Sequence, residues 1–414
     1  MTAAAAASAD LEPDGEDAAA KILSDGERDL RPAVSVDFSV MRGEGAFGTV
    51  FAARWSGPHP EREVATPIVV KVVRQHSLSQ RARRALRSEV ALHALLPPHQ
   101  HIVRLLGAFT VGSDSLHLVL QAAVGDCATA LAAGAPLHAL APRLGSQLFD
   151  AVAHLHQLSV VHSDLKPSNL LLDAQCQLQL CDLGAAARLA DGSGRSTLAG
   201  SPAYLAPEVV AITQLALQTC GAGYSFAADV WSVGVLLAEL LSGQLPFPAV
   251  PRDAAAQHAH ICFRPPTLEP AGAFSASARG LILSLLAKQS FLRPTAEEAR
   301  SHAFLKRDEA TVDAAAEAEA ARLTLTVLRD PQHEHRLSTH AGASGTPAGT
   351  DEGGLVSGLD ALALSAKAAR GVDAGAAERT QFGTPSTREA SQRDECSTSG
   401  SLVSWASSLV HGSP

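Results

Sequence analysis

Hydrophobic and polar positions change their spacing along the chain, and the first part consists of short strand-like runs. Three runs rich in β-branched residues, separated by Gly, Pro and His, predict strands at 34–40, 49–55 and 67–73. The next stretch, 81–96, has helical spacing and ends before Pro97. Two more apolar runs predict strands at 102–109 and 115–121. This part therefore predicts a small β-rich lobe with one main helix.

After Gly125 the helical period dominates the pattern. In the segment 143–158, Leu144, Leu148 and Leu155 fall on one stripe, which predicts an amphipathic helix. The segment 225–243 is apolar on every side, which predicts a central, buried helix. The fold class predicted is α+β, with the β-rich small lobe followed by a mostly helical large lobe.

Composition narrows the class of protein. The 414 residues are 46% hydrophobic and 18% charged, which is enough apolar material for two packed lobes. The net charge of -9 argues against a dedicated nucleic-acid binder, which needs a cationic surface. Six cysteines occur without a CxxC pair, which favours a reduced cytoplasmic setting, with the nucleus as the alternative.

The two ends of the chain differ from its centre. Residues 1–33 are acidic, lack aromatic side chains and predict a disordered tail. Residues 308–330 are rich in Ala and Glu and predict a helical extension, either solvated or docked on the large lobe or on a partner. Residues 331–414 are of low complexity and predict a disordered tail, where regulators could bind. We expect no signal peptide, and no membrane-spanning helix because the most apolar helix is too short.

A glycine-rich segment lies between the first two predicted strands. Gly43, Gly45 and Gly48 are spaced so that backbone N–H groups can approach phosphate oxygens without obstruction by a Cβ atom. A dinucleotide-binding loop needs a helix directly after its glycines, whereas a strand-like run follows here. The pattern therefore favours a phosphate-covering hairpin.

Lys71 lies in the middle of the apolar run 67–73 and needs a counter-charge if it points inward. In the following helix, Leu86, Glu89 and Val90 share one stripe, so the Glu89 carboxylate faces the apolar side. A buried carboxylate is costly unless it is paired. Lys71 is the nearest cation in this arrangement, and we expect it to pair with Glu89 and to bind nucleotide phosphates.

A second group of polar residues surrounds the apolar pair 170–172 and 178–180. Asp164 could orient a hydroxyl nucleophile and accept its proton, and Lys166 could offset charge on a γ-phosphate. Asn169 and Asp182 offer oxygen ligands of the type that a divalent metal prefers. Each residue alone would be an ordinary surface group, but their order and spacing after a glycine loop and a strand lysine make coincidence improbable.

These motifs together resemble those of eukaryotic protein kinases of the serine/threonine branch. The matching sequences, GEGAFGTV, IVVKVV, HSDLKPSN, DLG, AYLAPE and ADVWSVG, fall within residues 34–307. The resemblance implies the bilobal protein-kinase fold, with an N-lobe at 34–119, a hinge at 120–124 and a C-lobe at 125–307. It implies transfer of the γ-phosphoryl group of ATP, with Mg²⁺, to Ser or Thr hydroxyls of protein substrates.

The resemblance also implies individual roles. Asp164, Lys166, Lys71 and Glu89 would be catalytic, and Asn169 and Asp182 would hold the metal. The nucleotide would lie against Gly43, Gly45, Gly48, Val50, Val69, Lys71, Leu120, Gln121, Ala123 and Leu171. Ser201 would bond Asp164 and Lys166 from the substrate-docking loop. Glu208 would pair with Arg293, and Asp229 would brace the catalytic loop.

The sequence departs from the family pattern at two informative positions. Ser163 stands where many members carry an arginine that binds an activation-segment phosphate, so we expect basal activity without that phosphate. Val69 stands where an alanine usually contacts adenine. The alternative to an active enzyme is an ATP-binding pseudokinase or scaffold with little turnover, although Lys71, Asp164, Asn169 and Asp182 are all retained.

Overall fold

A computed structural model describes the central part of the chain. The described residues are 34–45, 48–55, 67–76, 78–112, 114–189, 199–215, 224–248, 254–306 and 313–330. All of them belong to one compact unit. The predictions for residues 1–33 and 331–414 lie outside the described residues.

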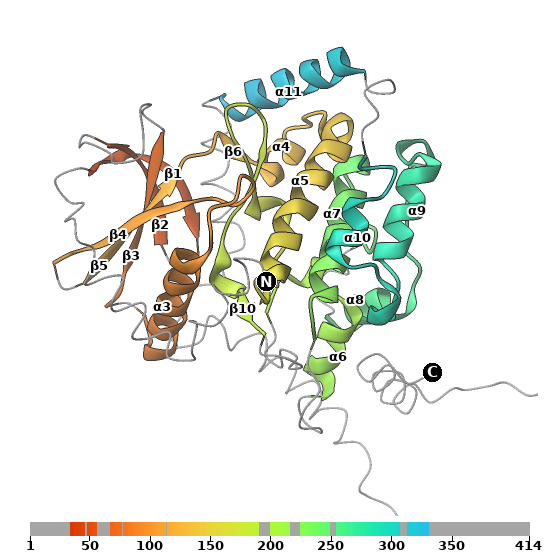
Figure 1. Ribbon diagram of the computed structural model, residues 1–414, viewed down its shortest axis with the longest axis horizontal. Helices are drawn as coiled ribbons and strands as arrows, with labels where there is room; N and C mark the ends of the chain where they lie inside the picture. The colour runs from red at the N-terminus through yellow and green to blue at the C-terminus, as the bar shows by residue number, and fades with distance from the viewer. Residues whose placement is uncertain are drawn as a thin grey trace, which may run out of the picture. The chain divides into compact units, whose positions relative to one another are not determined.

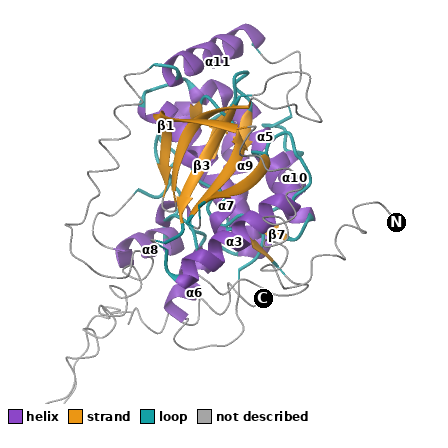
Figure 2. Ribbon diagram, turned by 90° about the vertical axis from the view of Figure 1, so that its left-hand side faces the viewer, coloured by secondary structure: helices purple, strands orange, loops and turns teal. Residues whose placement is uncertain are grey.

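The N-terminal lobe is built on a five-stranded antiparallel sheet with the strand order β1-β2-β3-β5-β4. Its elements are β1 (Val34–Gly45), β2 (Gly48–Trp55), β3 (Ile68–Arg74), α3 (Gln80–Leu95), β4 (Leu105–Val111) and β5 (Ser115–Gln121). Helix α3 begins where the Ser79 hydroxyl accepts a hydrogen bond from the N–H of Ala82. Figures 1 and 2 show α3 beside this sheet, on the side of the helical lobe.

The C-terminal lobe is mostly helical. Its helices are α4 (Cys127–Ala132), α5 (Leu137–Gln157), α6 (Pro207–Leu215), α7 (Ala227–Ser242), α8 (Ala254–Phe263), α9 (Ala276–Leu285), α10 (Ala296–Arg300) and α11 (Ala314–Leu328). Its short strands are β6 (Gly125–Asp126), β7 (Val160–Val161), β8 (Leu170–Leu172), β9 (Leu178–Leu180) and β10 (Ala187–Arg188). Single 3₁₀ turns cover Pro167–Asn169, Leu183–Ala185, Pro202–Tyr204, Ala271–Ala273 and Ser290–Leu292. Strands β6, β8 and β9 form one small sheet, and β7 pairs with β10.

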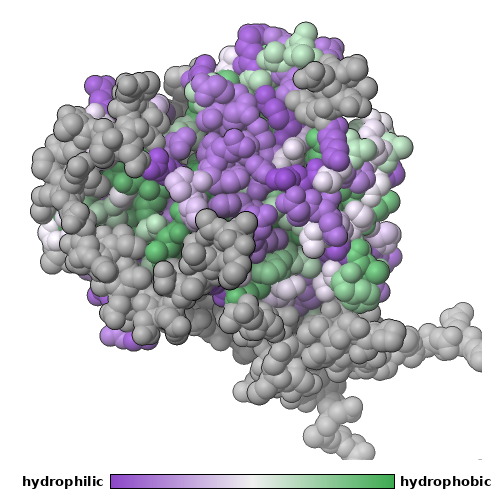
Figure 3. All heavy atoms as spheres, in the orientation of Figure 1, coloured by the Kyte–Doolittle hydropathy of each residue, from purple (hydrophilic) through white to green (hydrophobic). Residues whose placement is uncertain are grey.

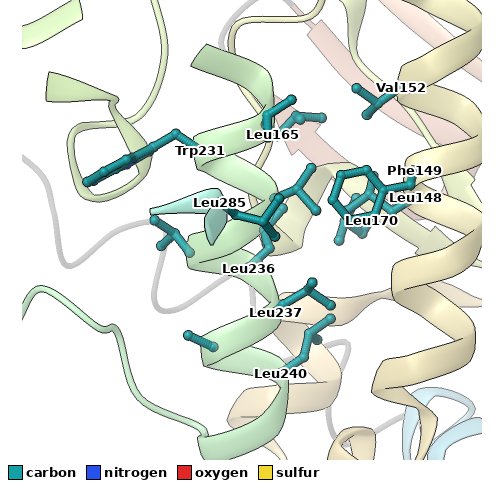
Figure 4. Close-up of a cluster of buried hydrophobic side chains, with 14 of the residues drawn as sticks. Leu148, Phe149, Val152, Leu165, Leu170, Trp231, Leu236, Leu237, Leu240 and Leu285 are labelled. Atoms are coloured by element: carbon teal, nitrogen blue, oxygen red, sulfur yellow. The ribbon is translucent and has the colours of Figure 1, made fainter. Parts of the chain in front are cut away.

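The main hydrophobic core lies between α5, α7 and α9. Figure 4 shows leucines of α7 facing Leu148, Phe149 and Val152 of α5. Helix α7 is buried over nearly its whole length, as its all-round apolar pattern predicts, and it ends at Gly243, which has a φ of 72°. A Cβ atom on Gly234 would lie 2.8 Å from the Cβ of Leu285, so α7 and α9 approach closely there.

Several predicted boundaries differ from those observed, and strand β1 extends to Gly45 rather than ending at residue 40. Helix α5 begins at Leu137 rather than at residue 143, with Pro142 inside its N-terminal part. Pro142 has no backbone N–H and so removes one hydrogen bond of the helix. The buried side chains of Leu137 and Leu140 nevertheless extend the apolar stripe to the N-terminal side of Pro142. Strand β4 spans Leu105–Val111 rather than 102–109, because Ile102 instead forms an isolated bridge with Leu180.

Polar side chains cover much of the helical lobe. Figure 3 shows hydrophilic residues gathered over the face that carries α4 and α5 in Figure 1. Within the described residues, none of the helices combines the length and the apolar character needed to cross a bilayer.

Candidate active site

Lys71 and Glu89 form an ion pair between the sheet and α3. The Lys71 Nζ lies 3.3 Å from Glu89 Oε1, and the two side chains are 16% and 9% exposed. On β3, Ile68 and Val70 are buried on one face, so the alternation of the strand places Val69 and Lys71 together on the other. Burial opposes the charge of Lys71, but Glu89 and Asp182 outweigh it and raise the pKa of Lys71 above its ordinary value.

Asp182 lies near the same pair at the start of the turn Leu183–Ala185. Its backbone is left-handed, with φ 63° and ψ 83°, and its Oδ1 accepts a hydrogen bond of 3.2 Å from the N–H of Gly184. A Cβ atom on Gly184 would lie 3.1 Å from Asp182 Oδ1 and 3.3 Å from Glu89 Oε2. The absence of a side chain at Gly184 therefore lets the Asp182 and Glu89 carboxylates approach the same region.

The Asp164 carboxylate of the catalytic loop, residues 162–169, accepts several hydrogen bonds. Lys166 Nζ donates to its Oδ2 at 2.6 Å, and both the N–H and the hydroxyl of Ser201 donate to its Oδ1 at 2.8 Å. Lys166 Nζ also donates to the Ser201 oxygen at 3.2 Å. The predicted contacts of Ser201 with Asp164 and Lys166 are therefore present in the structure.

These bonds control the protonation of Asp164. Burial alone would raise its pKa, but the hydrogen bonds from Lys166 and Ser201 outweigh burial and hold the pKa below the ordinary aspartate value. The carboxylate is consequently ionised at neutral pH. It can accept a hydrogen bond from a hydroxyl group, as it already does from Ser201.

Asn169 links the catalytic loop to Cys181, the residue between β9 and Asp182. Its Nδ2 donates to the Asp164 carbonyl at 2.8 Å, and its own carbonyl accepts the N–H of Cys181 at 3.0 Å. Because the amide nitrogen is engaged, the Oδ1 of Asn169 is the atom that can coordinate a cation. Together with the exposed Asp182 it provides two hard oxygen ligands, which fits Mg²⁺ because Mg²⁺ takes its remaining ligands from phosphate and water. No cluster of three or more His, Cys, Asp or Glu side chains able to hold a metal occurs among the described residues.

Asp229 of α7 braces the catalytic loop from inside the lobe. Its carboxylate is 1% exposed and accepts hydrogen bonds of 2.8 Å from the N–H groups of His162 and Ser163. His156 Nε2 lies 3.0 Å from the same carboxylate. Ser163 has a φ of 69°, an uncommon conformation for a residue with a side chain, so these bonds hold a strained turn directly before Asp164.

Gly200, at the end of the activation segment that starts near Arg188, lies close to the backbone of the same turn. Gly200 has a φ of 110°, and a Cβ atom there would lie 2.4 Å from the carbonyl oxygen of Ser163. Only glycine allows this approach, which positions Ser201 beside Asp164. Gly200 was not among the predicted site residues, because its role depends on a contact with a segment far away in the chain.

Two further contacts tie the substrate-docking turn to the core. The hydroxyl of Tyr204 donates to Glu239 Oε2 at 2.8 Å, and the hydroxyl of Ser232 donates to the carbonyl of Tyr204 at 2.8 Å. Neither Glu239 nor Ser232 was a predicted site residue. The sequence signal that could have identified them is their polar character within the mostly apolar helix α7.

Glu208 and Arg293 form a buried bidentate pair. Arg293 Nη1 lies 2.6 Å from Glu208 Oε1, Arg293 Nη2 lies 2.8 Å from Oε2, and the two side chains are 0% and 4% exposed. Arg293 also donates to the carbonyls of Ala227, Ala287 and Lys288. The pair anchors the start of α6 to the segment after α9, away from the reacting groups.

The residues predicted to hold the nucleotide lie along β1, β2, β3, the end of β5, the hinge and β8; the first two residues of the predicted hinge, Leu120 and Gln121, belong to β5. In the sheet, Val50 pairs with Lys71, and Val69 pairs with Leu120. Gly43 pairs with Val50, and Gly45 pairs with Gly48 at the end of the β1–β2 hairpin, whose connecting residues 46–47 lie outside the described part.

Backbone hydrogen bonds engage most of the predicted hinge. The N–H groups of Gln121, Ala122 and Val124 donate to Arg104, Pro67 and Leu172 respectively. Within the described part of the chain, the N–H of Ala123 makes no backbone hydrogen bond. Leu171 follows on β8, opposite Asp126 of β6. That the Ala123 amide meets the adenine edge stays a prediction.

Comparison with known proteins agrees with this arrangement. The model of the protein kinase domain matches residues 38–305. The chain is 32% identical to Serine/threonine-protein kinase PEPKR2 of Arabidopsis thaliana over 64% of this chain and 52% of that protein. It is 32% identical to human Serine/threonine-protein kinase D2 over 66% of this chain and 29% of that protein. It is 30% identical to human Dual specificity mitogen-activated protein kinase kinase 7 over 64% of this chain and 62% of that protein.

A family match over more than half of the chain, on a two-lobed structure, settles the class. The chain belongs to the protein kinase family. It spans between about three tenths and three fifths of the length of these three relatives.

Proposed function

We propose that the protein is an active serine/threonine kinase that transfers the γ-phosphoryl group of Mg-ATP to protein substrates. The observation that carries this proposal is the ionised Asp164 carboxylate, which is bonded to Lys166 and accepts a serine hydroxyl at 2.8 Å. The same loop is linked through Asn169 to Asp182, and Asp182 lies near the Lys71–Glu89 pair. These bonds, and the nearness of Asp182 to Lys71, support a role for all of these residues in one site.

The residues of this chain would divide the reaction among them. Lys71, fixed by Glu89, would hold the α- and β-phosphates, and Asn169 with Asp182 would hold Mg²⁺, which neutralises phosphate charge when bound. Asp164 would orient the substrate hydroxyl and take its proton as the new O–P bond forms. The bond from the γ-phosphorus to the β-phosphate oxygen breaks, ADP leaves, and Lys166 would offset charge on the transferred group.

The test is Mg-ATP turnover on a generic protein substrate. Asp164→Asn and Lys71→Met should each lower the rate by about a hundredfold or more, since each removes a group that acts in the transition state. Glu319→Gln, an exposed carboxylate on α11, is the matched control and should leave the rate unchanged. Equal signals in all four proteins would indicate a contaminating kinase, and nucleotide binding without turnover would favour the scaffold alternative.

We also propose that basal activity needs no phosphate on the activation segment. Both ends of that segment are held by contacts of the unmodified chain. Arg188 of β10 pairs with Val160 of β7, and Gly200 packs against Ser163. Phosphatase treatment and the Thr197→Ala variant should leave the rate within about twofold, and loss of activity in either would refute this proposal. Thr197 itself lies outside the described residues.

The proposed setting is the cytoplasm, with the nucleus as the alternative, and the proposed partners are proteins that carry target Ser or Thr residues. The free thiols of Cys127, Cys176 and Cys262, all buried, fit a reducing compartment. Imaging of a tagged protein would test the location. Regulators that bind residues 331–414 stay a prediction from composition.

A further inference from the structure

Helix α11 lies beyond the family match and packs on the helical lobe. The matched domain ends at residue 305, whereas α11 spans Ala314–Leu328 and contacts α4 and α5. Figures 1 and 2 both show it lying across one end of the lobe. Its buried residues are Glu317, Ala320, Thr324 and Leu328, which form one stripe along the helix. The docked face is therefore a defined surface of the helix.

The C-terminal end of α11 lies directly on the strand that follows the hinge. Leu328 is 6% exposed, and a Cβ atom on Gly125 would lie 2.8 Å from Leu328 Cδ2. Gly125 is the first residue of β6 and pairs with Leu172 of β8. The preceding residue, Val124, donates its N–H to Leu172 as well, at 2.8 Å. Leu328 thus covers the point where the hinge joins β8.

The N-terminal end of α11 is anchored to the same small sheet from another direction. Glu317 Oε1 lies 3.2 Å from Arg143 Nη1, and Arg143 Nη2 donates at 3.0 Å to the carbonyl of Cys176. Cys176 lies in the turn between β8 and β9. Leu328 therefore contacts the β6-β8-β9 sheet directly, and Glu317 is connected to the same sheet through Arg143. Leu171 lies on β8 of this sheet, and the hinge residue Ala123 shortly precedes β6 in the chain.

We propose that Leu328 is a positioning residue for the nucleotide: by holding β6 against β8, α11 fixes the hinge and Leu171 and thereby increases affinity for adenine nucleotides. This inference rests on the proposed kinase function. A helix that only covered apolar surface would contribute to stability alone. The positioning role predicts instead that the nucleotide constants change while the rate of the chemical step does not.

The experiment compares the wild-type chain with Leu328→Ala, Leu328→Met and Leu323→Ala. Leu323 lies on the same helix and is 40% exposed, so its variant is the matched control. Kd for Mg-ADP is measured by titration calorimetry, and KM for ATP and kcat are measured with saturating peptide, well below the unfolding temperature of each protein. Leu328→Ala should raise Kd and KM roughly three- to thirtyfold, with kcat within about twofold. Leu328→Met should restore most of the affinity, and Leu323→Ala should match the wild type.

The outcomes separate the two proposals. Unchanged Kd and KM in Leu328→Ala, with only a lower unfolding temperature, would overturn the positioning role and leave the kinase function intact. A wild-type protein that binds Mg-ADP without turnover would overturn the proposed catalysis, while the Kd comparison would still decide the role of Leu328. A wild-type protein that binds no nucleotide would overturn both. If Leu328→Ala does not fold, Leu328→Val, which removes less side chain, provides the same comparison with a smaller expected change.

Discussion

Replacing Asp229 with asparagine tests how the buried core holds the catalytic loop. The Asp229 carboxylate accepts the N–H groups of His162 and Ser163 and a contact from His156. An asparagine of the same shape has one acceptor oxygen and one donor NH₂ group. At least one of the two backbone N–H groups would then face a donor and lose its partner.

The magnitude follows from those bonds. Losing a hydrogen bond to a charged group costs about 1.5–3 kcal/mol, and a buried N–H without a partner costs about 1–3 kcal/mol, so with overlap between the two we expect a loss of about 3 kcal/mol. Against a total stability of about 5–15 kcal/mol, the Asp229→Asn variant should still fold. Its activity should fall by about a hundredfold, because Asp164 follows the displaced loop and small misplacements of a reacting group are costly.

A second substitution tests whether strain at Ser163 carries the effect. Ser163 has a φ of 69°, which glycine adopts without penalty. Ser163→Gly should therefore stabilise the wild type by about 1 kcal/mol and should be less favourable, by up to about 1 kcal/mol, in the Asp229→Asn background, where the weakened bonds no longer hold the strained turn. Urea unfolding of the four proteins measures this coupling, and peptide phosphorylation measures the activity. A loss below about 0.5 kcal/mol in Asp229→Asn, or no coupling in the cycle, would refute the reasoning.

The pH dependence provides an independent check on the same residue. Burial would raise the pKa of Asp229, but the bonds from His156 and His162 outweigh burial and lower the pKa below the ordinary aspartate value. A carboxyl group with a lowered folded pKa stabilises the fold above its unfolded pKa, and this stabilisation is lost as the pH falls through the folded pKa. The difference between wild type and Asp229→Asn should therefore be constant near neutral pH and shrink below about pH 4. A difference that grew with acid would contradict the assignment.

Three further substitutions have defined outcomes. Gly200→Ala should lower kcat about tenfold or more and also lower the unfolding temperature, because its Cβ would lie 2.4 Å from the Ser163 carbonyl oxygen and a φ of 110° is strained for alanine; normal activity and stability would refute the close approach. Glu208→Gln should cost about 3–5 kcal/mol in urea unfolding, since it leaves the buried Arg293 charge unpaired; a loss under 1 kcal/mol would contradict this. Burial lowers the pKa of Lys288 to about 8, so the unfolded chain holds this proton to higher pH and stability should rise between pH 8 and 10.5. Lys288→Met should reduce that rise, as unfolding curves at both ends of the range would show; an equal rise in the variant would contradict the shifted pKa.

Local periodicity and the free-energy cost of burying a charged group were sufficient to predict the Lys71–Glu89 pair. The helical spacing placed Glu89 on the stripe of Leu86 and Val90, and the cost of burying its carboxylate required a cation. The all-round apolar character of α7 likewise predicted its central position. These inferences succeeded because each depends on one segment and on a strong physical penalty.

Contacts between distant segments could not be found in this way. Asp229 and His156 are 73 residues apart, and no local pattern indicates that a histidine of α5 faces that carboxylate. The docking of α11 was left open for a related reason. Its buried stripe contains Glu317 and Thr324, whereas Leu323 is exposed, so hydrophobic periodicity does not identify the docked face.

Helix α7 explains why the catalytic and substrate loops keep a fixed relation to each other. Three of its buried or partly buried polar residues bind these loops: Asp229 binds the catalytic loop, while Ser232 and Glu239 bind the backbone and the hydroxyl of Tyr204. Burying these groups is favourable only while all of the bonds are made. A shift of the helix would break them together, so the hydrophobic core holds both loops in one register. These bonds of the unmodified chain support the proposal that basal activity needs no phosphate on the activation segment.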